Sequence, residues 1–191
     1  MATEASYSPT RFLTVAEYEA IEAATGLKHE YVLGEVYALA GATEAHNNIA
    51  GNIIAALKPA CREAHCRVVG SDQKLQVQDD EIFYYPDIQV LCDPKDDDPL
   101  IKRRPCVIVE ISSPSTRTSD HREKLLAYRG IESLNLYLIV ATDRREVVVH
   151  IRQGDSEWGS YVAGTKESIE IPCLHGYRLS LDDIYIDVLP D

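Results

Sequence analysis

The sequence predicts one α/β domain in which helices flank a central mixed β-sheet. Residues 106–111 and 136–141 are nearly uninterrupted apolar runs, which is typical of central strands covered on both faces. Between these runs, residues 119–129 have the pattern of a helix, and Gly130 is placed to end it. A longer helix is predicted from residue 44 to about residue 66, because apolar side chains recur there at helical spacing.

The first predicted elements are a short helix and a hairpin. Thr14 and Glu17 have the spacing of a capping box that opens a helix, and Gly26 would close it. β-rich segments on both sides of Leu33 and Gly34 predict a hairpin. Further β-like segments are predicted at residues 67–69, 74–78, 82–84, 88–92 and 147–151.

Three details complete the predicted chain. Pro59 is expected to kink the long helix or to end its first half. Residues 93–104 are polar and charged, which predicts an exposed loop, and a short helix is expected near Ser180. The expected boundaries are 1–191 for a single domain, about 12–152 for its core and 153–191 for a β-rich C-terminal extension.

The composition argues against some classes of binding partner. A formal net charge of −12 argues against broad, non-specific binding to nucleic acid or anionic lipid, although a local basic groove remains compatible with it. No apolar run approaches the ~20 residues that cross a bilayer, so we expect no membrane partner. We expect no secretory signal, a cytoplasmic location, and thiol side chains for the five scattered cysteines.

Two carboxylates stand where adjacent strands would meet. Glu110 lies near the end of a central-type strand, and Asp87 follows Pro86 at the start of another. Adjacent strands can bring both acids to the same edge of the sheet, where a divalent cation such as Mg²⁺ would neutralise them. On spacing alone, the alternatives stay open that Asp87 is a turn acid and Glu110 an exposed strand end.

A lysine on the following helix completes this candidate site. Asp120, Lys124 and Tyr128 are spaced four apart and therefore share one stripe of the helix, while Leu125 and Leu126 are expected to supply its apolar contact. Lys124 is the candidate group for orienting a water and offsetting phosphate charge. Alternatively, Asp120 and Lys124 form an ordinary exposed ion pair.

Glu30 and His46 are further candidates. Glu30 lies in the predicted hairpin, and His46 lies in the first turn of the long helix. Either side chain could reach the same cleft as a metal ligand or phosphate contact. The alternatives are a half-exposed strand acid for Glu30 and a locally bonded helix-start residue for His46.

Four stretches of the chain form a recognisable series: EYVLGEVYALAGATEAHNNIAGNI, FYYPDIQVLCD, VIVEISSPST and DHREKLLAYRG. With these stretches, the chain resembles the Uma-type family of restriction endonucleases, a branch of the PD-(D/E)xK nuclease superfamily. The resemblance covers roughly residues 12–152. It implies a restriction-endonuclease-like core and a Mg²⁺-dependent phosphodiesterase site, with Mn²⁺ as a possible substitute.

The resemblance also implies roles for individual residues. Asp87 takes the place of the motif aspartate and Glu110 that of the motif acid, and the carbonyl of Ile111 would complete the metal shell. The superfamily lysine two positions after the acid is replaced here by Ser112, so the helix-borne Lys124 is expected to act instead.

The expected function is therefore hydrolysis of DNA phosphodiester bonds. Asp87, Glu110, Lys124 and Glu30 form the expected catalytic set, and His46, Asp120 and Tyr128 are expected to support it. One alternative is a nuclease fold that binds nucleic acid or a protein without cutting, and another is an interaction protein with incidental carboxylates. A homodimer is a further expectation, since two sites could then address two strands.

Overall fold

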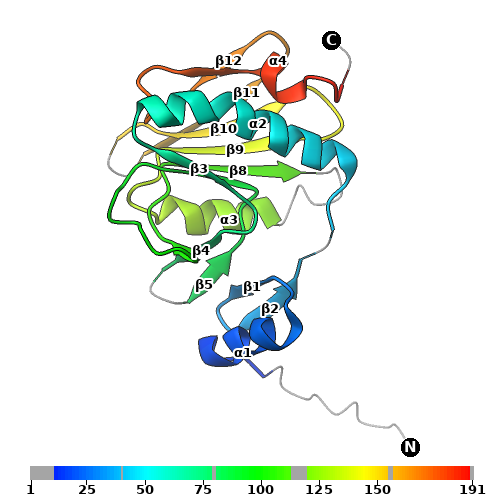
Figure 1. The fold of residues 1–191 in the computed structure, drawn as a ribbon, viewed down its shortest axis with the longest axis vertical. Helices are drawn as coiled ribbons and strands as arrows, with labels where there is room; N and C mark the ends of the chain where they lie inside the picture. The colour runs from blue at the N-terminus through cyan, green and yellow to red at the C-terminus, as the bar shows by residue number, and fades with distance from the viewer. Residues whose placement is uncertain (1–10, 40, 79–80, 113–119, 155–156, 190–191) are drawn as a thin grey trace, which may run out of the picture.

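The computed structural model describes residues 11–189 apart from residues 40, 79–80, 113–119 and 155–156 (Figure 1). The helices are α1 (Val15–Thr25), α2 (Glu44–Glu63), α3 (Asp120–Arg129) and α4 (Leu181–Tyr185). The strands are β1 (His29–Val32), β2 (Glu35–Ala38), β3 (Arg67–Gly70), β4 (Lys74–Val77), β5 (Ile82–Tyr84), β6 (Ile88–Leu91), β7 (Ile101–Lys102), β8 (Val107–Ser112), β9 (Leu136–Ala141), β10 (Val147–Arg152), β11 (Trp158–Ala163), β12 (Ser168–Glu170) and β13 (Arg178–Ser180). Among these helices, none combines the length and the apolar character that crossing a membrane requires.

A six-stranded mixed sheet is the centre of the molecule. Its strand order is β11-β10-β9-β8-β6-β3, with β8 and β9 parallel and the other neighbours antiparallel. The central strands β8 and β9 are buried along their whole length, as their apolar sequences predict. The predicted α/β class with a central mixed sheet flanked by helices is therefore confirmed.

Other strands form separate sheets. The N-terminal hairpin joins a five-stranded sheet of order β2-β1-β5-β4-β7, and β12 pairs with β13 alone. The capping box of Thr14 and Glu17 opens α1 as predicted, and Gly26 closes it in the left-handed conformation. Leu33 and Gly34 have positive φ at the hairpin turn. Because β1 pairs with β5, the hairpin is held near the strands that lead into β6.

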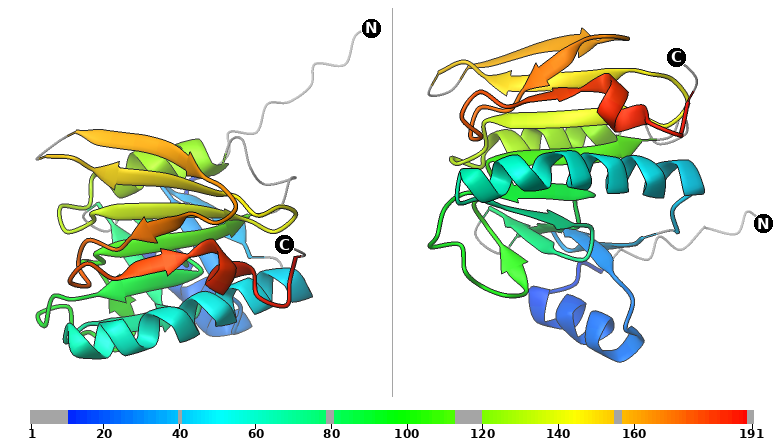
Figure 2. Two further views of the ribbon diagram at one scale, coloured as in Figure 1. Left: turned by 90° about the horizontal axis from the view of Figure 1, so that it is seen from above. Right: turned by 45° about the horizontal axis from the view of Figure 1, so that its top comes forward.

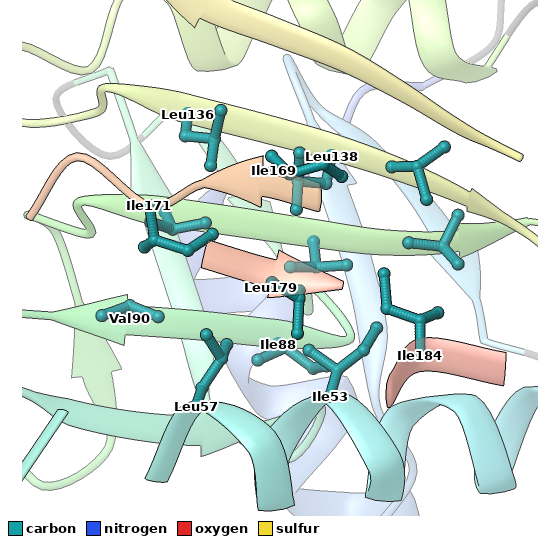
Figure 3. Packing of buried hydrophobic residues seen from close by; sticks show 14 of the residues in the cluster. Ile53, Leu57, Ile88, Val90, Leu136, Leu138, Ile169, Ile171, Leu179 and Ile184 are labelled. Carbon is teal, nitrogen blue, oxygen red and sulfur yellow. The ribbon is translucent and has the colours of Figure 1, made fainter. Parts of the chain in front are cut away.

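Helix α2 covers one face of the central sheet. Its apolar residues recur every three or four positions and point at the sheet, where Ile53 and Leu57 meet Ile88 and Val90 of β6 (Figure 3). The pair β12–β13 and helix α4 extend this layer over β9, with Ile169 among the side chains in contact. These side chains form one apolar core. Figure 2 shows the elements around it, with α2 and the C-terminal segments on one side of the sheet.

Helix α3 lies on the opposite face (Figure 2). Along β8, Val107, Val109 and Ile111 pack in the α2 core, whereas Ile108 packs with Tyr128 of α3. Side chains of a strand alternate between faces, so Glu110 shares the α3 face with Ile108. This alternation decides which helix meets the candidate acid.

The structure excludes one of the two alternatives for Pro59, an end of the helix, and it corrects the exposed loop predicted for residues 93–104. Helix α2 continues through Pro59 to Glu63, so Pro59 does not end it; its packed residues lie on both sides of the proline and hold the helix against the sheet. Residues 93–104 are not wholly an exposed loop, because β7 pairs with β4 and Asp96 is buried. The Asp96 carboxylate accepts hydrogen bonds from the backbone N–H groups of Arg103 and Arg104, which offsets its burial.

The expectation that the cysteines are thiols is also wrong for four of them. Cys66 is bonded to Cys92, and Cys106 is bonded to Cys173, while Cys61 is a free, buried thiol. Burial raises the pKa of the Cys61 thiol to about 11. The paired positions are 26 and 67 residues apart in sequence, so only the tertiary fold brings them together.

Candidate active site

The two candidate acids lie at the same edge of the central sheet. β6 and β8 are antiparallel with Ile88 opposite Val109, so Asp87 and Glu110 are the next residues outward on the two strands. Asp87 Oδ2 accepts a hydrogen bond of 2.7 Å from the backbone N–H of Ile111. This bond ties the Asp87 carboxylate to the strand that carries Glu110.

Glu110 is buried, at 8% exposure, and is surrounded by charged and polar groups. The Tyr128 hydroxyl donates to Glu110 Oε1 at 2.7 Å, and Lys124 Nζ lies 3.4 Å from the same oxygen. Burial, with the charges of Asp87 and Glu30, raises the pKa of Glu110 to about 7, although Lys124 and Tyr128 oppose the shift. A cation bound beside Glu110 would favour its ionised form.

Lys124 joins the hairpin to the edge of the central sheet. Its Nζ donates to Glu30 Oε1 at 2.8 Å, and the side chain is only 6% exposed. The ammonium also lies over the Tyr84 ring, 5.2 Å from its centroid. Glu30 is buried in β1, so the pairing of β1 with β5 places a third carboxylate at this site.

Neighbouring aromatic rings hold the side chain of Tyr128 in α3. Tyr128 is fully buried and makes edge-to-face contacts with Tyr84 and Tyr137, at centroid distances of 5.4 and 5.2 Å. Such contacts hold a ring in one orientation. The packing of its ring therefore directs the Tyr128 hydroxyl at Glu110.

His46 reaches Asp87 from the first turn of α2. Thr43 caps this helix by accepting from the His46 backbone N–H, and His46 Nε2 lies 3.2 Å from Asp87 Oδ1. The hydrogen bond to Asp87 is the main cause that raises the pKa of the His46 imidazole, whereas burial lowers this pKa. The histidine thus bonds to the candidate acid and is not only a locally bonded helix-start residue.

A cavity of about 600 Å³ is lined by the candidate residues Glu30, His46, Asp87, Glu110 and Lys124. Its walls come from the hairpin, the start of α2, the ends of β6 and β8, and α3. The polar and aromatic side chains that line it are Lys28, Glu30, Thr43, His46, Asn47, Ser71, Tyr85, Asp87, Glu110, Lys124 and Thr142.

The helix α3 differs from its prediction in one respect. Lys124 and Tyr128 face the sheet together, whereas Leu126 is 70% exposed and Leu125 is only partly buried. The prediction that Leu125 and Leu126 form the helix's apolar contact is therefore wrong for Leu126. The sheet-facing side of α3 is taken by Lys124 and Tyr128 because both side chains hydrogen-bond to buried carboxylates there. The side chain of Asp120 lies outside the described residues.

Residues 15–182 match the Uma2 family, described as "Putative restriction endonuclease". The chain belongs to the Uma2 family. Two uncharacterized proteins of Synechocystis sp. are similar to this Uma2 chain. The first, slr1290, is 27% identical over 186 residues, covering 97% of each chain. The second, sll1609, is 30% identical over 152 residues, covering 78% of this chain and 86% of the relative.

A solved structure supports the fold. It is described as a putative nuclease belonging to DUF820 from Anabaena variabilis ATCC 29413. It matches with a TM-score of 0.73 and 16% identity, covering 93% of the Uma2 chain and 99% of its own. The predicted restriction-endonuclease-like fold is confirmed, and the family supports a nuclease-like function.

Two aromatic residues of this Uma2 site were missed from sequence. Tyr84 lies under the Lys124 ammonium, and Tyr85 lines the cavity. The two tyrosines directly precede Pro86 and Asp87 in the sequence. Because side chains alternate along a strand, they could have been predicted to point to opposite sides, with Tyr84 in the α3 core and Tyr85 on the other side.

The donor set of the Uma2 site suits a hard divalent cation. Asp87 and Glu110 supply carboxylate oxygens at one edge, and oxygen ligands are what Mg²⁺ prefers. Among the described residues, Lys124 and Tyr128 both donate to Oε1 of the Glu110 carboxylate, so Oε2 can serve another interaction. Three carboxylates, of Glu30, Asp87 and Glu110, share the cavity with the Lys124 ammonium. The backbone N–H of Ile111 donates to Asp87, and Ile111 also lines the cavity.

Proposed function

We propose that this chain is a metal-dependent endonuclease that hydrolyses phosphodiester bonds in DNA. The observation that carries the proposal is the convergence of Asp87, Glu110 and Lys124, from three separate elements, on one cavity. Membership of the Uma2 family supports the same chemistry.

Asp87, Glu110 and the Ile111 carbonyl would hold Mg²⁺, with Mn²⁺ as a substitute. The ion would supply charge stabilisation on the phosphate and a more acidic water. The hydrogen bond between Asp87 and the Ile111 N–H would hold two of these three ligands in a constant relation.

Lys124 would orient the attacking water and offset charge on the phosphate. Glu30 holds the ammonium in place at 2.8 Å, and Tyr128 holds the Glu110 carboxylate. His46 would position Asp87 through the hydrogen bond between their side chains. Because Ser112 replaces the superfamily lysine, the water depends on a lysine that enters from the helix side.

The first experiment measures thermal stability with and without Mg²⁺ or Mn²⁺. Metal at about 100 times its Kd should stabilise the fold by about 2.7 kcal/mol, which corresponds to roughly 5–10 °C in Tm for a chain of this size. The Asp87→Ala and Glu110→Ala variants should lose this shift. Glu19→Ala, which removes an exposed carboxylate from α1, is the matched control and should keep it.

The second experiment incubates supercoiled plasmid DNA with the metal-loaded chain. Nicked or linear product that disappears in Glu110→Ala supports the proposal. A metal shift without cleavage of double- or single-stranded DNA would favour the binding protein that does not cut. An unchanged Tm at millimolar metal would leave the carboxylates without a metal role and reject the proposal.

A homodimer is part of this proposal, because two sites could address the two strands of a duplex. Light scattering tests it with the full chain. A mass of twice 21.3 kDa is the expected result, and a monomer mass would remove the dimer from the proposal.

A further inference from the structure

Four cysteines converge near the strand ends that lie farthest from the candidate site. Cys92 directly follows β6 and Cys106 directly precedes β8, whereas Asp87 and Glu110 lie at the other ends of these two strands. Cys66 precedes β3, and Cys173 lies between β12 and β13. The cluster therefore brings together four segments that are distant in sequence.

The two bridges in this cluster are neighbours. Cys66–Cys92 joins β3 to β6, with the two Cα atoms 4.3 Å apart, and Cys106–Cys173 joins β8 to the C-terminal segment. The sulfur atoms of Cys92, Cys106 and Cys173 all lie within 4.8 Å of one another. A thiolate released from one bridge would stand beside the other, at a separation from which small side-chain movements permit exchange.

Each bridge pairs a buried cysteine with a half-buried one. Cys66 and Cys106 are buried, whereas Cys92 and Cys173 are partly exposed. A small thiol or disulfide can reach the half-buried partner of each pair, and the buried partner is positioned to complete the exchange. Cys61, in contrast, is buried in α2 and belongs to neither bridge.

We propose that these four cysteines form a reversible thiol–disulfide site, which small-molecule disulfides such as oxidised glutathione close and small thiols open. The thiolate of the half-buried cysteine attacks the small disulfide and releases one thiol. The buried cysteine then attacks the mixed disulfide and releases the second. As each bridge forms, its pair of cysteine thiols gives two electrons to the small disulfide, and the two protons of the protein thiols end on the released thiols.

Closing the site would lock the C-terminal segments onto the central sheet. Cys106–Cys173 spans 67 residues, and Cys66–Cys92 spans 26, so both bridges restrict the unfolded chain. Among cytosolic proteins, bridges of this kind are usually transient or redox-sensing rather than permanent. The proposal does not depend on the proposed nuclease activity, because its test measures thiols and stability.

The test uses the full chain equilibrated in buffers of oxidised and reduced glutathione. The protein is then denatured in acid, alkylated and weighed by mass spectrometry. Of the five cysteines, the oxidised protein should expose one thiol, Cys61, and the reduced protein all five. Peptide mapping should return the pairs Cys66–Cys92 and Cys106–Cys173. Reduction should lower Tm by about 10 °C.

Variants separate the site from general effects of cysteine loss. Cys61→Ala should keep the full difference in Tm between the oxidised and reduced forms. Cys66→Ala/Cys92→Ala and Cys106→Ala/Cys173→Ala should each lose part of that difference. In Cys106→Ala, the thiol of Cys173 should exchange with the neighbouring bridge, so mapping should find some Cys92–Cys173 pairs.

Three results would overturn the proposal. The first is five free thiols after equilibration with oxidised glutathione. The second is bridges that resist millimolar dithiothreitol until the chain is denatured, which would make them permanent. The third is one zinc ion per chain in protein purified without chelators, which would assign the sulfur atoms to a metal.

Discussion

Helices α2 and α3 cover opposite faces of one sheet, but they are held there by different chemistry. The buried residues of α2 are Ile49, Ile53, Leu57 and Cys61, at the helical spacing that the sequence shows. On α3, the buried set includes Lys124 and Tyr128, and a leucine, Leu126, faces outward.

The difference is between a face held by apolar packing and a face that buries charged groups. Replacing a buried ion pair by aliphatic side chains of similar volume is often neutral or stabilising, so stability alone does not account for a buried lysine among carboxylates. Such a departure from the local pattern is expected at functional sites. On α2, in contrast, burial of apolar area alone accounts for the position of the helix.

The largest effect is expected on the α3 side. Lys124→Met should lower plasmid cleavage by about 100-fold or more, and it leaves Glu30 and Glu110 without their shared cation, at a cost of about 3–5 kcal/mol. Cleavage is measured below the unfolding midpoint of the variant. Lys58→Met, at an exposed position of α2, should cleave normally.

A second variant separates folding from chemistry. Glu30→Gln/Lys124→Met removes one charge of each sign, so its stability should recover relative to Lys124→Met while cleavage stays low. Normal cleavage by this folded double variant would show that Lys124 has only a structural role.

The next effect is expected on α2. Leu57→Ala should destabilise the chain by about 2–5 kcal/mol, because it opens a cavity in a fully apolar core. Denaturant unfolding measures the loss. The metal-induced shift in Tm should persist, and its disappearance would mean that the two faces do not act separately.

Tyr128→Phe should cost about 1–3 kcal/mol, because it removes the donor to a buried carboxylate. Tyr177→Phe is the matched control on the α2 side, where the hydroxyl donates to the Ala56 carbonyl at 2.9 Å. Its cost should be smaller, about 0.5–1.5 kcal/mol. Equal losses in denaturant unfolding would argue that Glu110 gains nothing special from Tyr128.

The smallest effect is expected at Leu126. Leu126→Gln should change stability by no more than about 0.5 kcal/mol, since the side chain is already exposed. The same unfolding assay measures it, with Leu57→Ala as the reference for a buried leucine. A loss comparable to that of Leu57→Ala would place Leu126 under cover in solution and break the contrast between the helices.

Local sequence patterns predicted most elements because short-range physics specifies them. The capping box of α1, the Leu33–Gly34 turn and the apolar spacing of α2 each appear where predicted. The meeting of Asp87 and Glu110 was also predictable, because neighbouring antiparallel strands bring such residues to one edge. The roles of these residues in catalysis stay predictions.

Other features depend on contacts between distant segments. The pairing of β7 with β4 buries Asp96 in a segment whose charge predicted a loop. The bridge partners of Cys66 and Cys106 are 26 and 67 residues away, and no local pattern indicates them. The contact of His46 with Asp87 likewise requires α2 and β6 to be packed together.

By itself, the sequence determined most of the strands and helices, the buried stripe of α2 and the candidate acids with their lysine, because propensity and periodicity act over a few residues. Only the tertiary structure decided how the strands divide among sheets, that α3 buries Lys124 instead of Leu126, and which cysteines pair. These outcomes are set by long-range pairing and by the polar partners available at each buried position, and a local pattern contains neither.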